Sequence, residues 1–109
     1  MATTYKVLAQ VSPSATTATT LYTVPSTTST VVSTITVANL AGSAATYRIS
    51  VRPAAETQAN KHYIAYDVTV GANDTTTLTL GLTLATTDVI TVYASTNTLA
   101  FNVYGSEIA

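Results

Sequence analysis

Apolar and polar side chains alternate with a period of two residues along most of this 109-residue chain. Residues 45–52 show the pattern most clearly, because apolar side chains at positions 47, 49 and 51 alternate with polar ones at 48, 50 and 52. This period is typical of half-buried β-strands. Clusters of Pro, Gly, Asn, Asp and Ser separate the runs and indicate turns. The pattern predicts eight short strands, at residues 5–11, 21–24, 30–38, 45–52, 62–70, 75–82, 89–95 and 99–104.

Eight short strands separated by turns indicate an all-β fold, a two-sheet antiparallel sandwich of the jelly-roll or Ig-like type. The length suits one domain with one core. Residues 14–20 are only Ser, Ala and Thr, which predicts a connector. We therefore divide the chain into residues 1–19, an N-terminal arm or first strand with its connector, and residues 20–109, the sandwich domain. The arm either pairs within its own sandwich or adds a strand to a neighbouring copy.

The same alternation predicts which side chains fill the space between the sheets. The expected core consists of Val31 or Val32, Ile35, Val37, Tyr47, Ile49, Ile64, Tyr66, Val68, Leu78, Leu80, Ile90, Val92, Phe101 and Val103.

Composition narrows the class of protein. Threonine, with 25 residues, is the commonest side chain, and only 8% of residues are charged, against about 25% in an average soluble domain. A net charge of −1 with four basic residues argues against a nucleic-acid partner. The absence of cysteine excludes disulfides and a cysteine nucleophile. Neither a signal peptide nor a membrane-spanning run is visible, so we expect no membrane partner and synthesis without a signal peptide.

Charged residues are absent from the 41 consecutive positions between Lys6 and Arg48. Soluble β-proteins usually protect their edge strands with charges, proline or bulges. Either a threonine surface stays hydrated here, or the surface is covered by copies of the chain or by a larger partner. We favour a covered surface, because interface centres are depleted of charge. The interface residues expected on this basis are Val7, Val11, Tyr22, Thr34 and Thr36.

Residues that could perform chemistry are sparse. The only histidine is His62, and the five carboxylates form no recognisable acid–base or metal-ligand spacing. We expect no enzyme activity, no cofactor and no metal. Two alternatives stay open: Ca²⁺ held between subunits by some of Asp67, Asp74 and Asp88, and a sugar-binding platform made by the seven tyrosines.

Several strand segments resemble small virion-associated β-sandwich proteins of tailed bacteriophages. The resemblance covers roughly residues 20–108 and is carried by TLYTVP at 20–25, TVVSTITVAN at 30–39, GSAATYRISV at 42–51, LATTDVITVYAS at 84–95 and FNVYGSEI at 101–108. It implies a structural subunit of a phage particle, made in the host cytoplasm and located in the virion as a capsid decoration or a neck or tail accessory. Its partners would be copies of itself and a larger capsid, neck or tail protein. The alternative function is a carbohydrate- or receptor-binding β-sandwich module.

Overall fold

The structure, a computed structural model that describes residues 2–109, is built almost entirely from β-strands. The predicted all-β class, the number of strands and their order are confirmed. Two short 3₁₀ turns, η1 (Pro53–Ala55) and η2 (Asn60–His62), lie in the polar segment between the fourth and fifth strands. The strands are β1 (Thr3–Val11), β2 (Thr19–Thr23), β3 (Ser29–Asn39), β4 (Ala45–Arg52), β5 (Tyr63–Val70), β6 (Thr75–Leu84), β7 (Val89–Ala94) and β8 (Leu99–Ile108).

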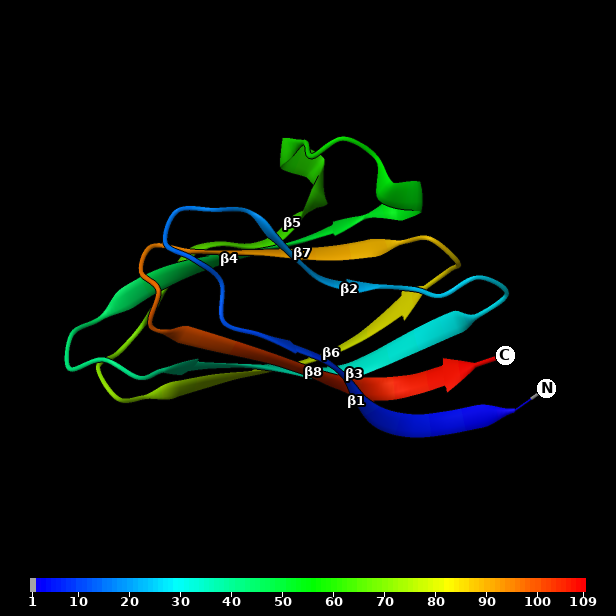
Figure 1. Cartoon of the computed structure of the whole chain (residues 1–109), viewed down its shortest axis with the longest axis horizontal. Helices are drawn as coiled ribbons and strands as arrows, with labels where there is room; N and C mark the ends of the chain where they lie inside the picture. Colours follow the sequence, from blue (N-terminus) through cyan, green and yellow to red (C-terminus); the bar gives the residue numbers. More distant parts are fainter. Residues whose placement is uncertain (1) are drawn as a thin grey trace.

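The strands form two four-stranded antiparallel sheets packed face to face (Figure 1). Sheet A has the order β1-β8-β3-β6, and sheet B has the order β2-β7-β4-β5. The first strand therefore pairs with the last, the second with the seventh, the third with the sixth and the fourth with the fifth. Such a chain is a long hairpin rolled into two layers. Of the two sandwich types that the sequence leaves open, this one is a jelly roll.

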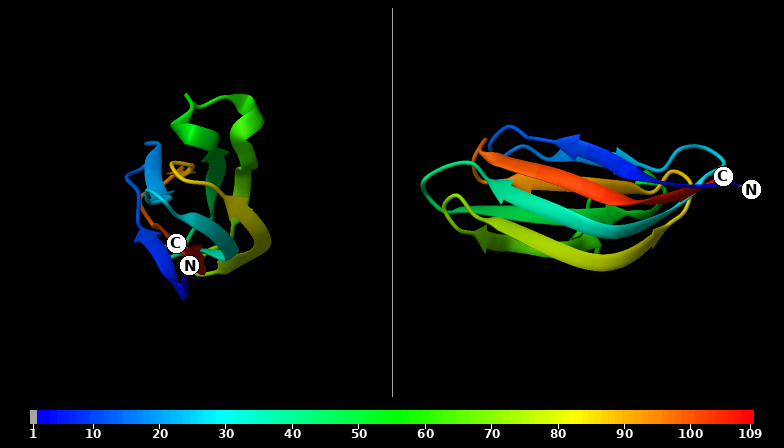
Figure 2. Two further views of the ribbon diagram at one scale, coloured as in Figure 1. Left: turned by 90° about the vertical axis from the view of Figure 1, so that its right-hand side faces the viewer. Right: turned by 90° about the horizontal axis from the view of Figure 1, so that it is seen from below.

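The N-terminal segment belongs to its own sandwich in this structure. β1 pairs with β8 from Thr3 to Val11, and it forms one edge of sheet A (Figure 2). Leu8, Ala9 and Val11 pack against the buried core. The connector from residue 12 to residue 18 then carries the chain across to β2 at the edge of sheet B.

The core lies between the two sheets, and much of it is as predicted. Tyr47 of sheet B meets Phe101 of sheet A edge to face, with ring centroids 6.1 Å apart. Leu78 is partly buried and packs against this core. The predicted residues that are fully buried are Val32, Ile35, Val37, Tyr47, Ile49, Ile90, Val92, Phe101 and Val103.

Four predicted core residues are wrong: Ile64, Tyr66, Val68 and Leu80 are 37–54% exposed. β-Bulges are the main cause, because each inserts a residue and shifts the alternation that follows. Tyr66 and Asp67 together face Arg48, with Asp67 at φ 52°, and a second irregularity follows beside Ile64. Val68 is paired with the buried Tyr47. It is nevertheless exposed because β5 is an edge strand, so only β4 covers one of its sides.

Leu80 is displaced by a bulge of its own. Leu80 and Gly81 together face Ser33, and Gly81 has φ 70°. Neighbouring irregularities at Leu8 of β1 and Ser33 of β3 continue this line across sheet A. Because bulges bend a strand and increase its twist, the line marks where the long strands of sheet A curve (Figure 2). The sequence predicts that the last strand ends before Gly105. This is wrong, because β8 continues through Gly105 to Ile108.

Candidate functional site

The outer face of sheet A carries no charged side chain. The four strands of this sheet contain only two charged residues, Lys6 and Glu107. In register, Lys6 lies opposite Gly105, which is paired with Val32, and Glu107 lies opposite Thr30. Val32 and Thr30 are buried, and residues directly opposite in an antiparallel pair lie on the same side of the sheet. Both charged side chains therefore leave the sheet on its inner side, which faces sheet B.

The two charges neutralise each other at the open edge between β1 and β2. Lys6 Nζ lies 2.8 Å from Glu107 Oε1, and the Tyr22 hydroxyl donates to Glu107 Oε2 at 2.5 Å. The same hydroxyl lies 2.8 Å from the Thr30 hydroxyl. Burial and the hydrogen bond to Glu107 raise the pKa of Tyr22 to about 12. The hydrogen bonds from Lys6 and Tyr22 hold the pKa of Glu107 below its usual value.

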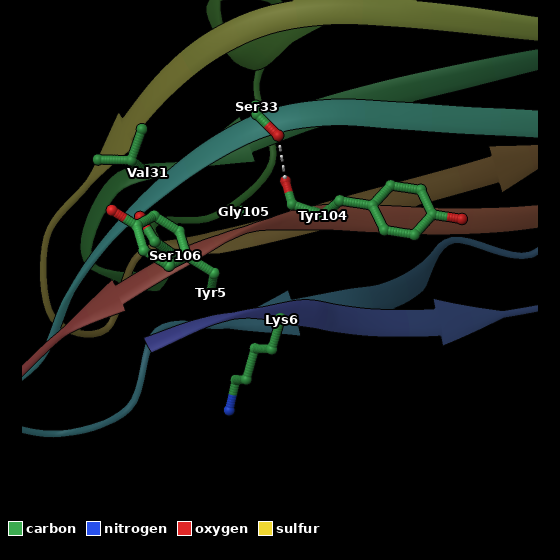
Figure 3. A pocket seen from close by; sticks show the side chains of 7 residues that line it. All are labelled: Tyr5, Lys6, Val31, Ser33, Tyr104, Gly105 and Ser106. Atoms are coloured by element: carbon green, nitrogen blue, oxygen red, sulfur yellow. Dashed lines mark hydrogen bonds between the residues drawn. The ribbon is translucent and has the colours of Figure 1, made fainter. Parts of the chain in front are cut away.

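One half of the outer face is apolar and hollowed. Tyr5 is 83% exposed and Val7 is 48% exposed, and both are on β1. The hollow, of about 450 Å³, is lined by residues of β1, β3 and β8 and includes Ser33, the irregular residue of β3 (Figure 3). In Figure 3 the Tyr5 ring lies across β8 beside Ser106, whereas Lys6 points away from these side chains. The hollow is lined by Tyr5, Lys6, Val31, Ser33, Tyr104, Gly105 and Ser106.

The other half of the face is polar but uncharged. Thr34 and Thr36 are half-buried on β3 and alternate with the fully buried Ile35 and Val37. Gln10 Nε2 donates to Asn102 Oδ1 at 2.6 Å beside them. Hydroxyl and amide groups thus lie on the half of the outer face that is outside the apolar hollow.

The structure brings three of the five expected interface residues to this face: Val7, Thr34 and Thr36. It does not bring Val11 or Tyr22 there. Val11 is paired with the buried Phe101 and packs toward the core, and Tyr22 is 7% exposed inside it. Tyr5 and Tyr104 also lie on this face, although neither is among the interface residues expected from the sequence. Tyr5 stands two residues before Val7, and this spacing on one strand was a signal that it shares the face of Val7.

Sheet B presents a different outer face, with charged and aromatic side chains together. The Arg48 guanidinium lies over the rings of Tyr66 and Tyr93, 4.2 Å and 4.4 Å from their centroids. Asp67 accepts two hydrogen bonds from Arg48, at 2.7 Å and 3.4 Å, which raise the pKa of the guanidinium. Tyr63 meets Tyr66 edge to face at 4.9 Å. Three of the seven tyrosines thus gather on this face, whereas Tyr22 and Tyr47 are buried and Tyr5 and Tyr104 line the hollow of sheet A.

His62 and the remaining carboxylates support loops. The Ala59 N–H donates to His62 Nδ1 at 3.0 Å, so the ring proton is on Nε2, which lies 3.1 Å from Glu56 Oε1. Asp88 accepts from the N–H groups of Ala54 and Ala85. Within residues 2–109, no three His, Asp or Glu side chains lie close enough together to hold a metal ion.

The chain matches neither a model of a known protein family nor a curated protein. Within the described residues, no helix has the length and the apolar character that crossing a membrane requires.

Proposed function

We propose that this protein is a non-enzymatic structural subunit of a bacteriophage virion, a capsid decoration or a neck or tail accessory. It packs on copies of itself and on a larger virion protein through the outer face of sheet A. The observation that carries this proposal is the absence of charge from that face. That the assembly is a phage particle rests on the resemblance of the strand segments to virion-associated sandwich proteins.

The physical argument is one of desolvation. A charge buried in an interface without a partner is costly, so the centres of specific interfaces are depleted of charge. Here a whole four-stranded face meets this condition, because the two charged side chains on its strands leave from the opposite side of the sheet and pair with each other at its edge. A standard interface needs about 800 Å² from each partner, roughly one seventh of the 5487 Å² surface of this chain. One sheet face of a sandwich is the right size for that.

The free edge of sheet A supports the same proposal. β6 is a ten-residue edge strand without charge or proline, and its only protection is the bulge at Leu80 and Gly81. The edges of sheet B are better protected, since β2 has only five residues and β5 carries Asp67 and two bulges. Exposed, uncharged edges are usually paired or covered in the working assembly.

The test is the mass of the purified chain in solution, measured by analytical ultracentrifugation over a range of concentrations. We expect wild-type chains to self-associate. Thr34→Lys and Thr36→Lys place a charge at the middle of the face, and each should weaken association at least about tenfold. Thr69→Lys is the matched control, because Thr69 is an exposed strand threonine of sheet B. A wild-type chain that stays monomeric at high concentration, or lysine variants that associate like Thr69→Lys, would overturn the proposal.

A further inference from the structure

A row of three side chains crosses the outer face of sheet B. Arg48 is directly opposite Tyr93 of β7, and on its other side it faces the bulge formed by Tyr66 and Asp67 of β5. Register therefore places a tyrosine on each flank of the guanidinium, and both rings stack on it. Because every member of the row is on a hydrogen-bonded strand, the rings are held in place before any ligand arrives.

A hollow of about 400 Å³ opens beside this row, lined by Asn60, Tyr63 and Tyr66. Its wall is the segment that contains η1 and η2, which rises from the edge of sheet B (Figure 1). This wall is tied to β4 by hydrogen bonds. Ser50 donates to Gln58 at 2.6 Å, and Arg52 donates to the Glu56 carbonyl at 2.8 Å. The volume lies in the lower part of the range of roughly 300–1,000 Å³ found for small-molecule sites.

The chemistry of the hollow suits a neutral, hydroxyl-rich ring. Tyr66 is 54% exposed and offers an apolar aromatic surface with a hydroxyl at its tip. The Asn60 amide supplies two donors and an acceptor. Asp67, next to Tyr66 in sequence and not part of the lining, has carboxylate lone pairs beyond those that Arg48 uses. Arg48 and Asp67 cancel each other's charge at 2.7 Å, so the site does not attract an anion such as a phosphate or an acidic peptide.

We propose that this hollow is a binding site for neutral carbohydrate. A pyranose ring packs its C–H face against the tyrosines, Tyr66 above all, and its hydroxyls hydrogen-bond to Asn60 and Asp67. Arg48 is a positioning residue, since it holds Tyr66 and Asp67. The site lies on the opposite side of the sandwich from the uncharged face of sheet A, so it does not depend on the proposed assembly. A subunit that packs through sheet A would display it outward.

The test uses the full ¹⁵N-labelled chain and three probes: maltotriose, cellotriose and tri-N-acetylchitotriose. We expect at least one of them to give saturable NMR shift changes, with a dissociation constant of roughly 0.1 to 10 mM, at Asn60, Tyr63 and Tyr66. Tyr66→Ala should weaken binding about three- to tenfold, and Tyr66→Phe should restore most of it. Leu40→Ala, which removes a 71% exposed apolar side chain from the loop between β3 and β4, is the control and should leave sugar binding unchanged.

Asn60→Ala is a second variant that leaves the strands intact and should also weaken binding. Three results would overturn the proposal: no saturable shifts with any of the three sugars, shifts that Tyr66→Ala and Asn60→Ala leave unchanged, or shifts confined to sheet A. If inorganic phosphate or a proline-rich peptide bound more strongly at these residues, the carbohydrate proposal would be wrong and the site would be assigned to a ligand of that class.

Discussion

At the scale of single residues, Gly105 is the glycine at which an added Cβ would meet the closest backbone contact. A Cβ added there would lie 2.0 Å from the Val31 carbonyl oxygen and 3.0 Å from the Val32 Cα, both on the adjacent strand β3. A glycine inside a strand often marks such a close approach of two backbones. We expect Gly105→Ala to lower the free energy of unfolding by about 1–3 kcal/mol, measured by urea denaturation.

Gly42→Ala is the control for this substitution. A Cβ at Gly42 meets nothing within 4 Å, so we expect a change within about 0.5 kcal/mol. Equal stability of the two variants would mean that β3 and β8 do not approach closely at Gly105.

Ile49 and Leu80 form a second matched pair, because both were expected in the core and only Ile49 is there. Ile49 is fully buried and Leu80 is 37% exposed at its bulge. Ile49→Ala should cost about 2–5 kcal/mol of unfolding free energy, since it leaves a cavity between the sheets. Leu80→Ala should cost less than about 1 kcal/mol. Similar costs in thermal or urea unfolding would contradict the register of β6.

Glu107 makes stability depend on pH. Its pKa in the folded chain is below the ordinary value of 4.5, because Lys6 and Tyr22 donate to the carboxylate. A lowered folded pKa adds stability above pH 4.5, and this contribution disappears as the pH falls through the folded pKa. Glu107→Gln should therefore destabilise the chain by about 1–3 kcal/mol at pH 7, and the difference from wild type should shrink below pH 4.5. Unfolding curves at pH 7 and at about pH 3 test this; an equal difference at both would contradict it.

At the scale of elements, β1 decides whether the sandwich can stand alone. It covers one edge of β8 from Phe101 to Ile108 and adds Leu8, Ala9 and Val11 to the core. Removing residues 1–17 would expose the backbone of β8 and these apolar contacts to water. We expect the remaining chain to lose its cooperative thermal transition, as followed by circular dichroism. A truncated chain that stays folded but no longer self-associates would instead make β1 a clasp between copies.

At the scale of the whole molecule, the two outer faces differ in charge. Sheet A presents none, whereas Arg48, Arg52 and Asp67 lie on the strands of sheet B. Association through sheet A should therefore be insensitive to screening. Raising NaCl from about 0.05 M to about 0.5 M should change the dissociation constant of self-association less than about threefold in ultracentrifugation. A strong weakening by salt would assign the contact to the charged side of the sandwich.

The sequence by itself determined the existence, type and order of the eight strands. Period-two alternation and turn residues are local features, and each strand carries its own copy of them. Residues 45–52, the clearest alternating run, form β4 with the predicted bounds. The lack of charge around Val7, Thr34 and Thr36 is also visible without a structure, and the structure places these three residues on the outer face of sheet A; their role in an interface stays a prediction.

Only the tertiary structure decided which side of a sheet each residue occupies. A bulge is set by hydrogen bonds to the neighbouring strand. The amino-acid sequences of β5 and β6 alone therefore did not reveal that Tyr66 and Leu80 lie outside the core. Long-range contacts also explain why Tyr22 is buried, although its place in the uncharged stretch of sequence predicted a surface position. Its burial depends on Thr30 and Glu107, which are 8 and 85 positions away.

The uncharged face itself is a product of topology. The uncharged stretch of sequence contains all of β3, which lies in sheet A, but also all of β2, which belongs to sheet B. The face is completed by β6 and β8, which lie outside that stretch, and it stays uncharged because Lys6 and Glu107 leave from the opposite side of the sheet. Pairing of the first strand with the last brings these segments together. Such long-range pairing depends on how all eight strands pack, which no single segment of the sequence specifies.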